Sequence, residues 1–75
     1  MEGRIIERKD FAGFEAAGRR AGCRVALLAE SIPAGGTAPG QMTEDDIQAP
    51  EEPGVYSLYE ATGARGYWEL FWVRD

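Results

Sequence analysis

Residues 31–53 constrain the fold of this 75-residue chain more than any other stretch. They hold all four prolines, three glycines and no aromatic residue. Residues of this kind at such density interrupt helices and strands. We therefore interpret 31–53 as one long connection between two apolar regions. A loop of this length is unusual inside a small domain and is often functional or mobile.

Before the connection, the pattern predicts a strand, a helix and a second strand. The first strand covers residues 4–8. A helix is predicted over 10–21, with Asp10 as its N-cap and Gly22 as the residue that ends it. The apolar stripe of this helix consists of Phe11, Phe14, Ala17 and Ala21. Residues 23–29 are largely apolar, which favours a strand in the middle of the sheet.

After the connection, residues 55–60 and 67–73 predict a hairpin, because they are rich in aromatic and branched side chains. A two-residue turn at Thr62-Gly63 would place Glu60 opposite Arg65. On the last strand, one face carries Trp68, Leu70 and Trp72, and the other carries Tyr67, Glu69, Phe71 and Val73. Because both faces are apolar, we expect more apolar surface than one helix can cover.

These elements predict a single α+β domain over residues 1–75. Its architecture is two-layered, with one helix packed on a mostly antiparallel four-stranded sheet in the order β-α-β-β-β. Within the connection, Thr43 and the acids after it are typical of a helix start, so a short helix at 43–49 is possible.

The composition excludes several classes of function. The net charge of −5 disfavours direct nucleic-acid binding, because a negative protein repels phosphate backbones. The chain has no histidine and no phosphate-binding glycine motif, so we expect no enzyme, no cofactor and no metal site. An enzyme built on two carboxylates is the alternative left open. A lone Cys23 and the lack of a long apolar run predict a cytoplasmic protein that does not bind membranes.

An acidic cluster in the connection is the first candidate binding site. It consists of Glu44, Asp45, Asp46, Glu51 and Glu52, with no basic residue among them. Such a patch can steer toward a basic partner surface and can mimic a phosphate backbone. The alternative is that the acids only keep a loop soluble and complement a helix dipole. Their spacing fits no calcium loop.

Aromatic residues of the hairpin are the second candidate. Core packing accounts for many of them, and we predict that Tyr67, Trp68 and Trp72 anchor a partner protein. A base-stacking platform is disfavoured, because such platforms have basic neighbours and the neighbours here are Glu60 and Glu69.

The acidic run at 43–52 and the aromatic-rich hairpin resemble the small phage-encoded inhibitors of the anti-CRISPR type. The resemblance covers the whole chain and is one of size, charge and style. It implies a non-enzymatic inhibitor in the host cytoplasm that blocks a basic, nucleic-acid-binding surface of a host defence complex.

Two further hypotheses come from other classes of protein. One is a structural or adaptor homo-oligomer, such as a homodimer, assembled through the aromatic face of the sheet. The other is a weak nucleic-acid binder that uses the basic residues of the N-terminal third. Those residues are Arg4, Arg8, Lys9, Arg19, Arg20 and Arg24.

Overall fold

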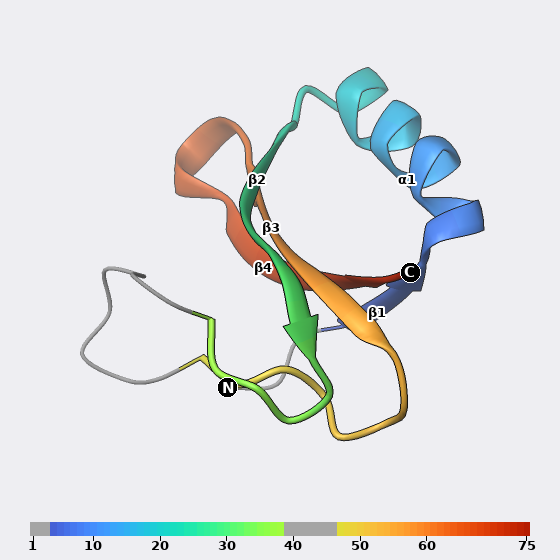
Figure 1. The fold of residues 1–75 in the computed structure, drawn as a ribbon. Coiled ribbons are helices and arrows are strands. Elements are labelled where there is room, and N and C mark those ends of the chain that lie inside the picture. The colour runs from blue at the N-terminus through green and yellow to red at the C-terminus, as the bar shows by residue number, and fades with distance from the viewer. Residues whose placement is uncertain (1–3, 39–46) are drawn as a thin grey trace.

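Four strands form one mixed sheet in the order β1-β4-β3-β2 in the computed structural model, which describes residues 4–38 and 47–75 (Figure 1). The elements in chain order are β1 (Arg4–Glu7), α1 (Arg8–Arg20), β2 (Arg24–Pro33), β3 (Val55–Thr62), the short 3-10 helix η1 (Ala64–Gly66) and β4 (Trp68–Arg74). β1 pairs with β4 in parallel, and the other two pairs are antiparallel. The predicted α+β class, with one helix and a mostly antiparallel four-stranded sheet, is confirmed.

β4 and β3 occupy the middle of the sheet, while β1 and β2 are its edges. The prediction that residues 23–29 form a central strand is therefore wrong. β2 is apolar in sequence, yet Ile32 is its one buried residue and Leu27 is 47% exposed. The central position belongs to β4 because its large side chains need cover on both faces.

Helix α1 begins directly after β1, two residues earlier than predicted. Glu7 is its N-cap and makes no capping bond through its side chain. Asp10, the predicted N-cap, lies instead in the first turn, where a carboxylate still complements the helix dipole. The helix begins where β1 ends, since the pairing of β1 with β4 runs only as far as Glu7. Gly22 has a φ of +87°, so its predicted left-handed conformation is confirmed.

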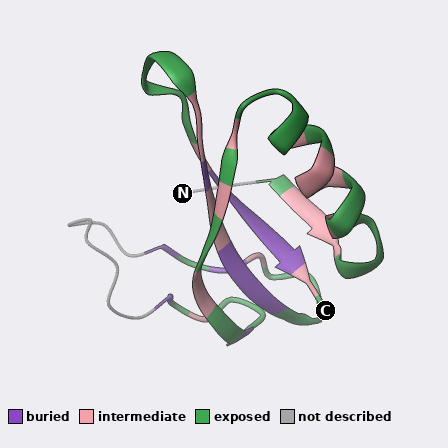
Figure 2. Cartoon of the chain, turned by 90° about the horizontal axis from the view of Figure 1, so that it is seen from above, coloured by how far each residue is buried: buried purple, intermediate pink, exposed green. Residues whose placement is uncertain are grey.

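We call the side of the sheet that faces α1 the helix-covered face. Its buried hydrophobic residues are Ala61, Phe71 and Val73, and Phe11 and Phe14 of α1 pack against them. The ring centroids of Phe14 and Phe71 lie 5.0 Å apart. No residue of α1 is buried, although residues of the sheet beneath the helix are buried (Figure 2). The predicted contact of the helix with the sheet is present, but Phe11 and Phe14 are only partly buried.

The opposite side is covered by the described parts of the connection between β2 and β3, residues 34–38 and 47–54, and we call it the connection-covered face. Its core consists of Ile32, Tyr56, Leu58, Leu70 and Trp72 together with Ala38, Ile47 and Ala49 of the connection. The connection is thus part of the core and not only the link between two apolar regions that the sequence indicated. Its few apolar side chains pack on the aromatic face that α1 does not reach, so one chain covers both faces of β4.

The link between β3 and β4 also differs from the predicted turn. Thr62 pairs with Trp68, and Glu60 lies opposite Leu70 rather than Arg65. The link contains η1, and the positive φ values belong to Arg65 (59°) and Gly66 (76°). The two-residue turn fails because β3 continues two residues further than predicted. The alternation of side chains along β4 is confirmed, since Leu70 and Trp72 belong to one core cluster and Phe71 and Val73 to the other.

Candidate partner-binding surface

The predicted acidic site lies only partly within the described residues. Glu44, Asp45 and Asp46 fall outside them, as does most of the predicted helix at 43–49. Glu51 is exposed, and the side chain of Glu52 is 63% exposed. A Glu52 carboxylate oxygen lies 3.5 Å from Nη1 of Arg74, and its main-chain carbonyl accepts a hydrogen bond of 2.7 Å from the Tyr56 hydroxyl.

Backbone hydrogen bonds hold the two ends of segment 39–46 together. The Ala38 amide donates to the Ile47 carbonyl at 2.8 Å, and the Ala49 amide donates to the Gly36 carbonyl at 2.8 Å. Thr37 and Gln48 form a β-bridge, so residues 47–49 are not helical. Ala38, Ile47 and Ala49 are each no more than 5% exposed. The segment that carries three of the five acids therefore begins and ends at a fixed place on the core.

The three predicted aromatic anchors lie in three different environments. Trp72 is 1% exposed and packs edge-on against Tyr56, with 6.3 Å between ring centroids. The prediction that Trp72 contacts a partner is therefore wrong, because its ring is part of the core. Tyr67 and Trp68 are 47% and 50% exposed and are available at the surface.

Tyr67 lies toward the helix-covered face, where its hydroxyl bonds to Glu69, a carboxylate whose two oxygens both accept hydrogen bonds. Its hydroxyl donates to Oε1 of Glu69 at 2.7 Å, and Nη2 of Arg4 donates to Oε2 of Glu69 at 2.8 Å. These bonds, first from Tyr67 and then from Arg4, lower the pKa of Glu69. The bond to Glu69 in turn raises the pKa of the Tyr67 hydroxyl. Both oxygens of Glu69 are used within the chain.

Trp68 belongs to the connection-covered face, where the alternation along β4 places it with Leu70 and Trp72. Its indole Nε1 donates to Oε1 of Glu60 at 2.7 Å. Among the described residues no cation forms an ion pair with Glu60. The sequence did not reveal this contact, because the wrong turn length paired Glu60 with Arg65. The register Thr62↔Trp68 is the feature that would have revealed it.

Several basic residues of the N-terminal third are engaged inside the molecule. Arg8 donates from Nε to Asp75 at 2.7 Å and lies over the rings of Phe11 and Tyr59. Bonds to the Tyr59 hydroxyl and to Asp75 raise the pKa of Arg8. Arg4 is bound by Glu69, and Arg19 lies 3.7 Å from Glu15. These partners reduce the positive charge that a nucleic acid would meet.

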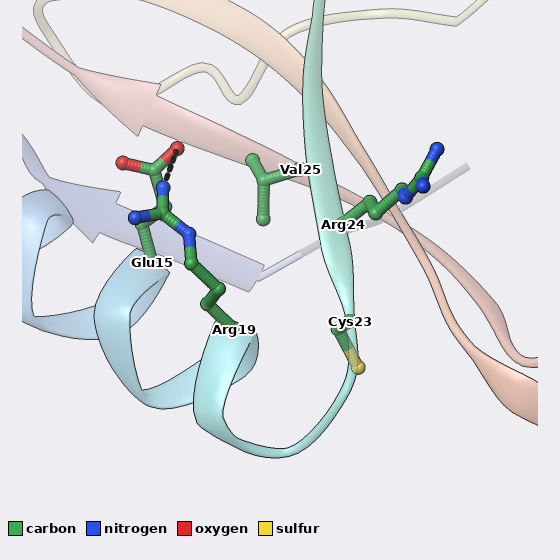
Figure 3. A pocket seen from close by; sticks show the side chains of 5 residues that line it. All are labelled: Glu15, Arg19, Cys23, Arg24 and Val25. Atoms are coloured by element: carbon green, nitrogen blue, oxygen red, sulfur yellow. Dashed lines mark ion pairs between the residues drawn. The ribbon is translucent and has the colours of Figure 1, made fainter.

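A hollow of about 390 Å³ opens between the end of α1 and the start of β2 (Figure 3). Glu15 and Arg19 line it from the helix, and Val25 points toward them from β2. Arg24 points to the opposite side of the strand, so the two arginines do not converge on one ligand. Cys23 lines this hollow and a smaller one of about 170 Å³ beside Phe14 and Tyr67. We assign no site to these hollows.

The described residues lack two features that would indicate other classes of function. No helix in that part of the chain is long and apolar enough to cross a membrane. In the same part, no three His, Cys, Asp or Glu side chains are grouped so that they could hold a metal ion. Comparisons with protein-family models, with curated proteins and with solved structures found no match to this chain.

Proposed function

We propose that the protein is a non-enzymatic inhibitor that binds a basic surface of a partner protein. The resemblance to small phage-encoded anti-CRISPR inhibitors makes a nucleic-acid-binding surface of a host defence complex, in the host cytoplasm, the first candidate target. One observation supports this function most. The acidic segment, residues 39–46 with Glu44, Asp45 and Asp46, is flanked by Ala38 and Ile47, which are buried on the connection-covered face and bonded to each other. It is therefore not a free tail at a chain end.

Attachment to the core matters because it lowers the cost of binding. A charged segment that leaves the fold from a fixed base loses less conformational freedom on association than a free tail does. Glu51 and Glu52 are exposed beside this base, and the sequence adds three more negative charges at 44–46. Charge of one sign speeds association with an oppositely charged surface and makes the rate sensitive to salt.

The oligomer and nucleic-acid hypotheses receive less support. The oligomer was inferred from an uncovered aromatic face of β4, but Leu70, Phe71, Trp72 and Val73 are each no more than 4% exposed in a single chain. Binding to nucleic acid would depend on arginines that are paired with carboxylates, such as Arg4 with Glu69 and Arg8 with Asp75.

The test replaces Glu44, Asp45, Asp46, Glu51 and Glu52 by their amides, which changes the net charge from −5 to 0. Purified CRISPR effector complexes are then assayed for binding of the protein and for loss of DNA binding, each at two salt concentrations. We expect association to slow about tenfold or more and its salt dependence to shrink, because steering depends on charge and on screening. The melting temperature should change little, because the described members of the set are exposed.

A matched pair of variants separates position from net charge. Amides at 44–46 and amides at Asp10, Glu15 and Glu30 both change the net charge from −5 to −2. The first variant should weaken inhibition and the second should not. Equal effects would show that net charge alone is responsible, and wild-type inhibition and salt dependence in the five-site variant would refute the proposed function.

A further inference from the structure

The chain twice places an arginine where an aromatic ring and a carboxylate meet. Arg4 lies 5.4 Å from the centroid of the Phe14 ring and bonds to Glu69. Arg8 lies 5.3 Å from the centroid of the Phe11 ring and bonds to Asp75. In both cases the ring attracts the guanidinium through its face, and the carboxylate accepts its N–H groups. Both arrangements lie on the helix-covered face.

A third ring and carboxylate lie on the opposite face and lack the arginine. The Trp68 indole is half exposed, and its bond to Glu60 restrains both side chains. That bond uses Oε1 of Glu60, and no described residue donates to Oε2. Arg24 is on the same face, across Thr62 from Trp68, but forms no ion pair with Glu60 in the described residues.

We propose that Trp68 and Glu60 form a binding site for an arginine side chain of the partner protein. The guanidinium would lie on the exposed indole and donate to Oε2 of Glu60, as Arg4 does with Phe14 and Glu69 inside the chain. Tryptophan is the ring that attracts cations most strongly, and its bond to Glu60 keeps the carboxylate beside the ring. The inference rests on the proposed function only in requiring a basic partner surface.

Arginine fits this site better than lysine. A guanidinium is planar, so it can stack on the indole while its edge still donates to a carboxylate. The strongly hydrated ammonium of lysine is a compact charge that offers no such plane. The site lies on the connection-covered face, which also carries the base of the acidic segment. One partner surface could therefore contact both.

The test follows the indole N–H signals of the two tryptophans by NMR during titration with a capped peptide of four arginines. Trp72 is buried and serves as the internal reference. We expect the Trp68 signal to shift in a saturable way while the Trp72 signal stays in place. A lysine peptide should bind about threefold more weakly, and a citrulline peptide, which is neutral and of nearly the same shape, should give no shift.

Two variants of equal net charge complete the test. Glu60→Gln keeps an acceptor for the indole but removes the charge, and we expect the Kd of the arginine peptide to rise about fivefold. Glu69→Gln removes the same charge from the other face and should leave the Kd within twofold. An unmoved Trp68 signal, an equal response to citrulline, or equal effects of the two variants would overturn the proposal. Because these measurements need no effector complex, their outcome is independent of the test of inhibition.

Discussion

The two faces of the sheet are covered in opposite ways. On one face lies a regular helix of 13 residues, none of which is buried. On the other lies an irregular connection that contributes three buried residues, Ala38, Ile47 and Ala49. Regular secondary structure and core membership are therefore separate properties. A helix can pack on a sheet through the apolar side chains of one face without burying any residue fully. An irregular segment can be ordered by a few buried side chains and the backbone hydrogen bonds beside them.

The difference follows from what each layer contacts. The helix packs on Phe71, Val73 and Ala61 through Phe11 and Phe14, and Arg4 and Arg8 extend over those two rings at its border. Ala38, Ile47 and Ala49 of the connection belong to the same core cluster as Tyr56 and Trp72, and amides of the connection bond across it. The connection therefore contributes buried residues to the core, whereas the helix contributes only partly buried ones.

Ile47→Ala should have the largest effect of the variants that test this comparison. Ile47 is 4% exposed, and truncation of buried isoleucine usually costs 2–5 kcal/mol, so we expect a loss of about 3 kcal/mol in the free energy of unfolding. Urea denaturation measures it, with Ile47→Val as a control that should lose about 1 kcal/mol. A loss under about 0.5 kcal/mol would mean that the connection is not a core layer.

Phe14→Ala should cost less than Ile47→Ala, although a larger side chain is removed. Phe14 is only partly buried, so we expect a loss of about 1.5 kcal/mol rather than the 3–5 kcal/mol typical of a buried phenylalanine. The same denaturation experiment measures it. A greater loss than for Ile47→Ala would reverse the ranking of the two layers.

Gly13→Ala should have the smallest effect of the three variants on the free energy of unfolding, and it should stabilise the protein rather than destabilise it. A methyl group at Gly13 meets no atom within 4 Å, and alanine is favoured over glycine inside a helix by about 1 kcal/mol. We therefore expect the melting temperature to rise by a few degrees. Gly54→Ala is the contrasting control. Gly54 has a φ of +145°, and the new methyl would lie 2.7 Å from Arg74, so this variant should be destabilised.

Much of the fold could be predicted from local patterns. The strands of the hairpin, the helix with Phe11 and Phe14 toward the sheet, and the alternation along β4 all follow from short-range periodicity. The strand order could not be predicted from these patterns, because β2 is as apolar in sequence as a central strand. Its edge position is evident only once β1 is known to pair with β4. The role of the connection was also missed, since prolines and glycines reveal where regular structure stops but not where isolated apolar residues pack.

The candidate site was predictable in composition but not in geometry. Sequence predicted Tyr67, Trp68 and Trp72 as partner contacts, and only the first two are exposed. Trp72 was grouped with them wrongly, because alternation places it on the same face as Trp68 but does not reveal which part of that face is covered. Which end of that face lies under the connection depends on a long-range contact. Glu60 was seen as a charge near the turn, and only the register of β3 with β4 reveals its bond to Trp68.

The parallel pairing of β1 with β4 sets the order in which a newly made chain can fold. Arg4 and Glu69 are 65 residues apart, so the sheet cannot close on its central strand until β4 has left the ribosome. Before then, β2 can pair with β3, but β1 has no strand beside it. Folds with such distant pairings form slowly, often in milliseconds to seconds. Charged residues beside an apolar strand oppose aggregation, and Arg4 and Glu7 flank Ile5 and Ile6 in this way during the interval.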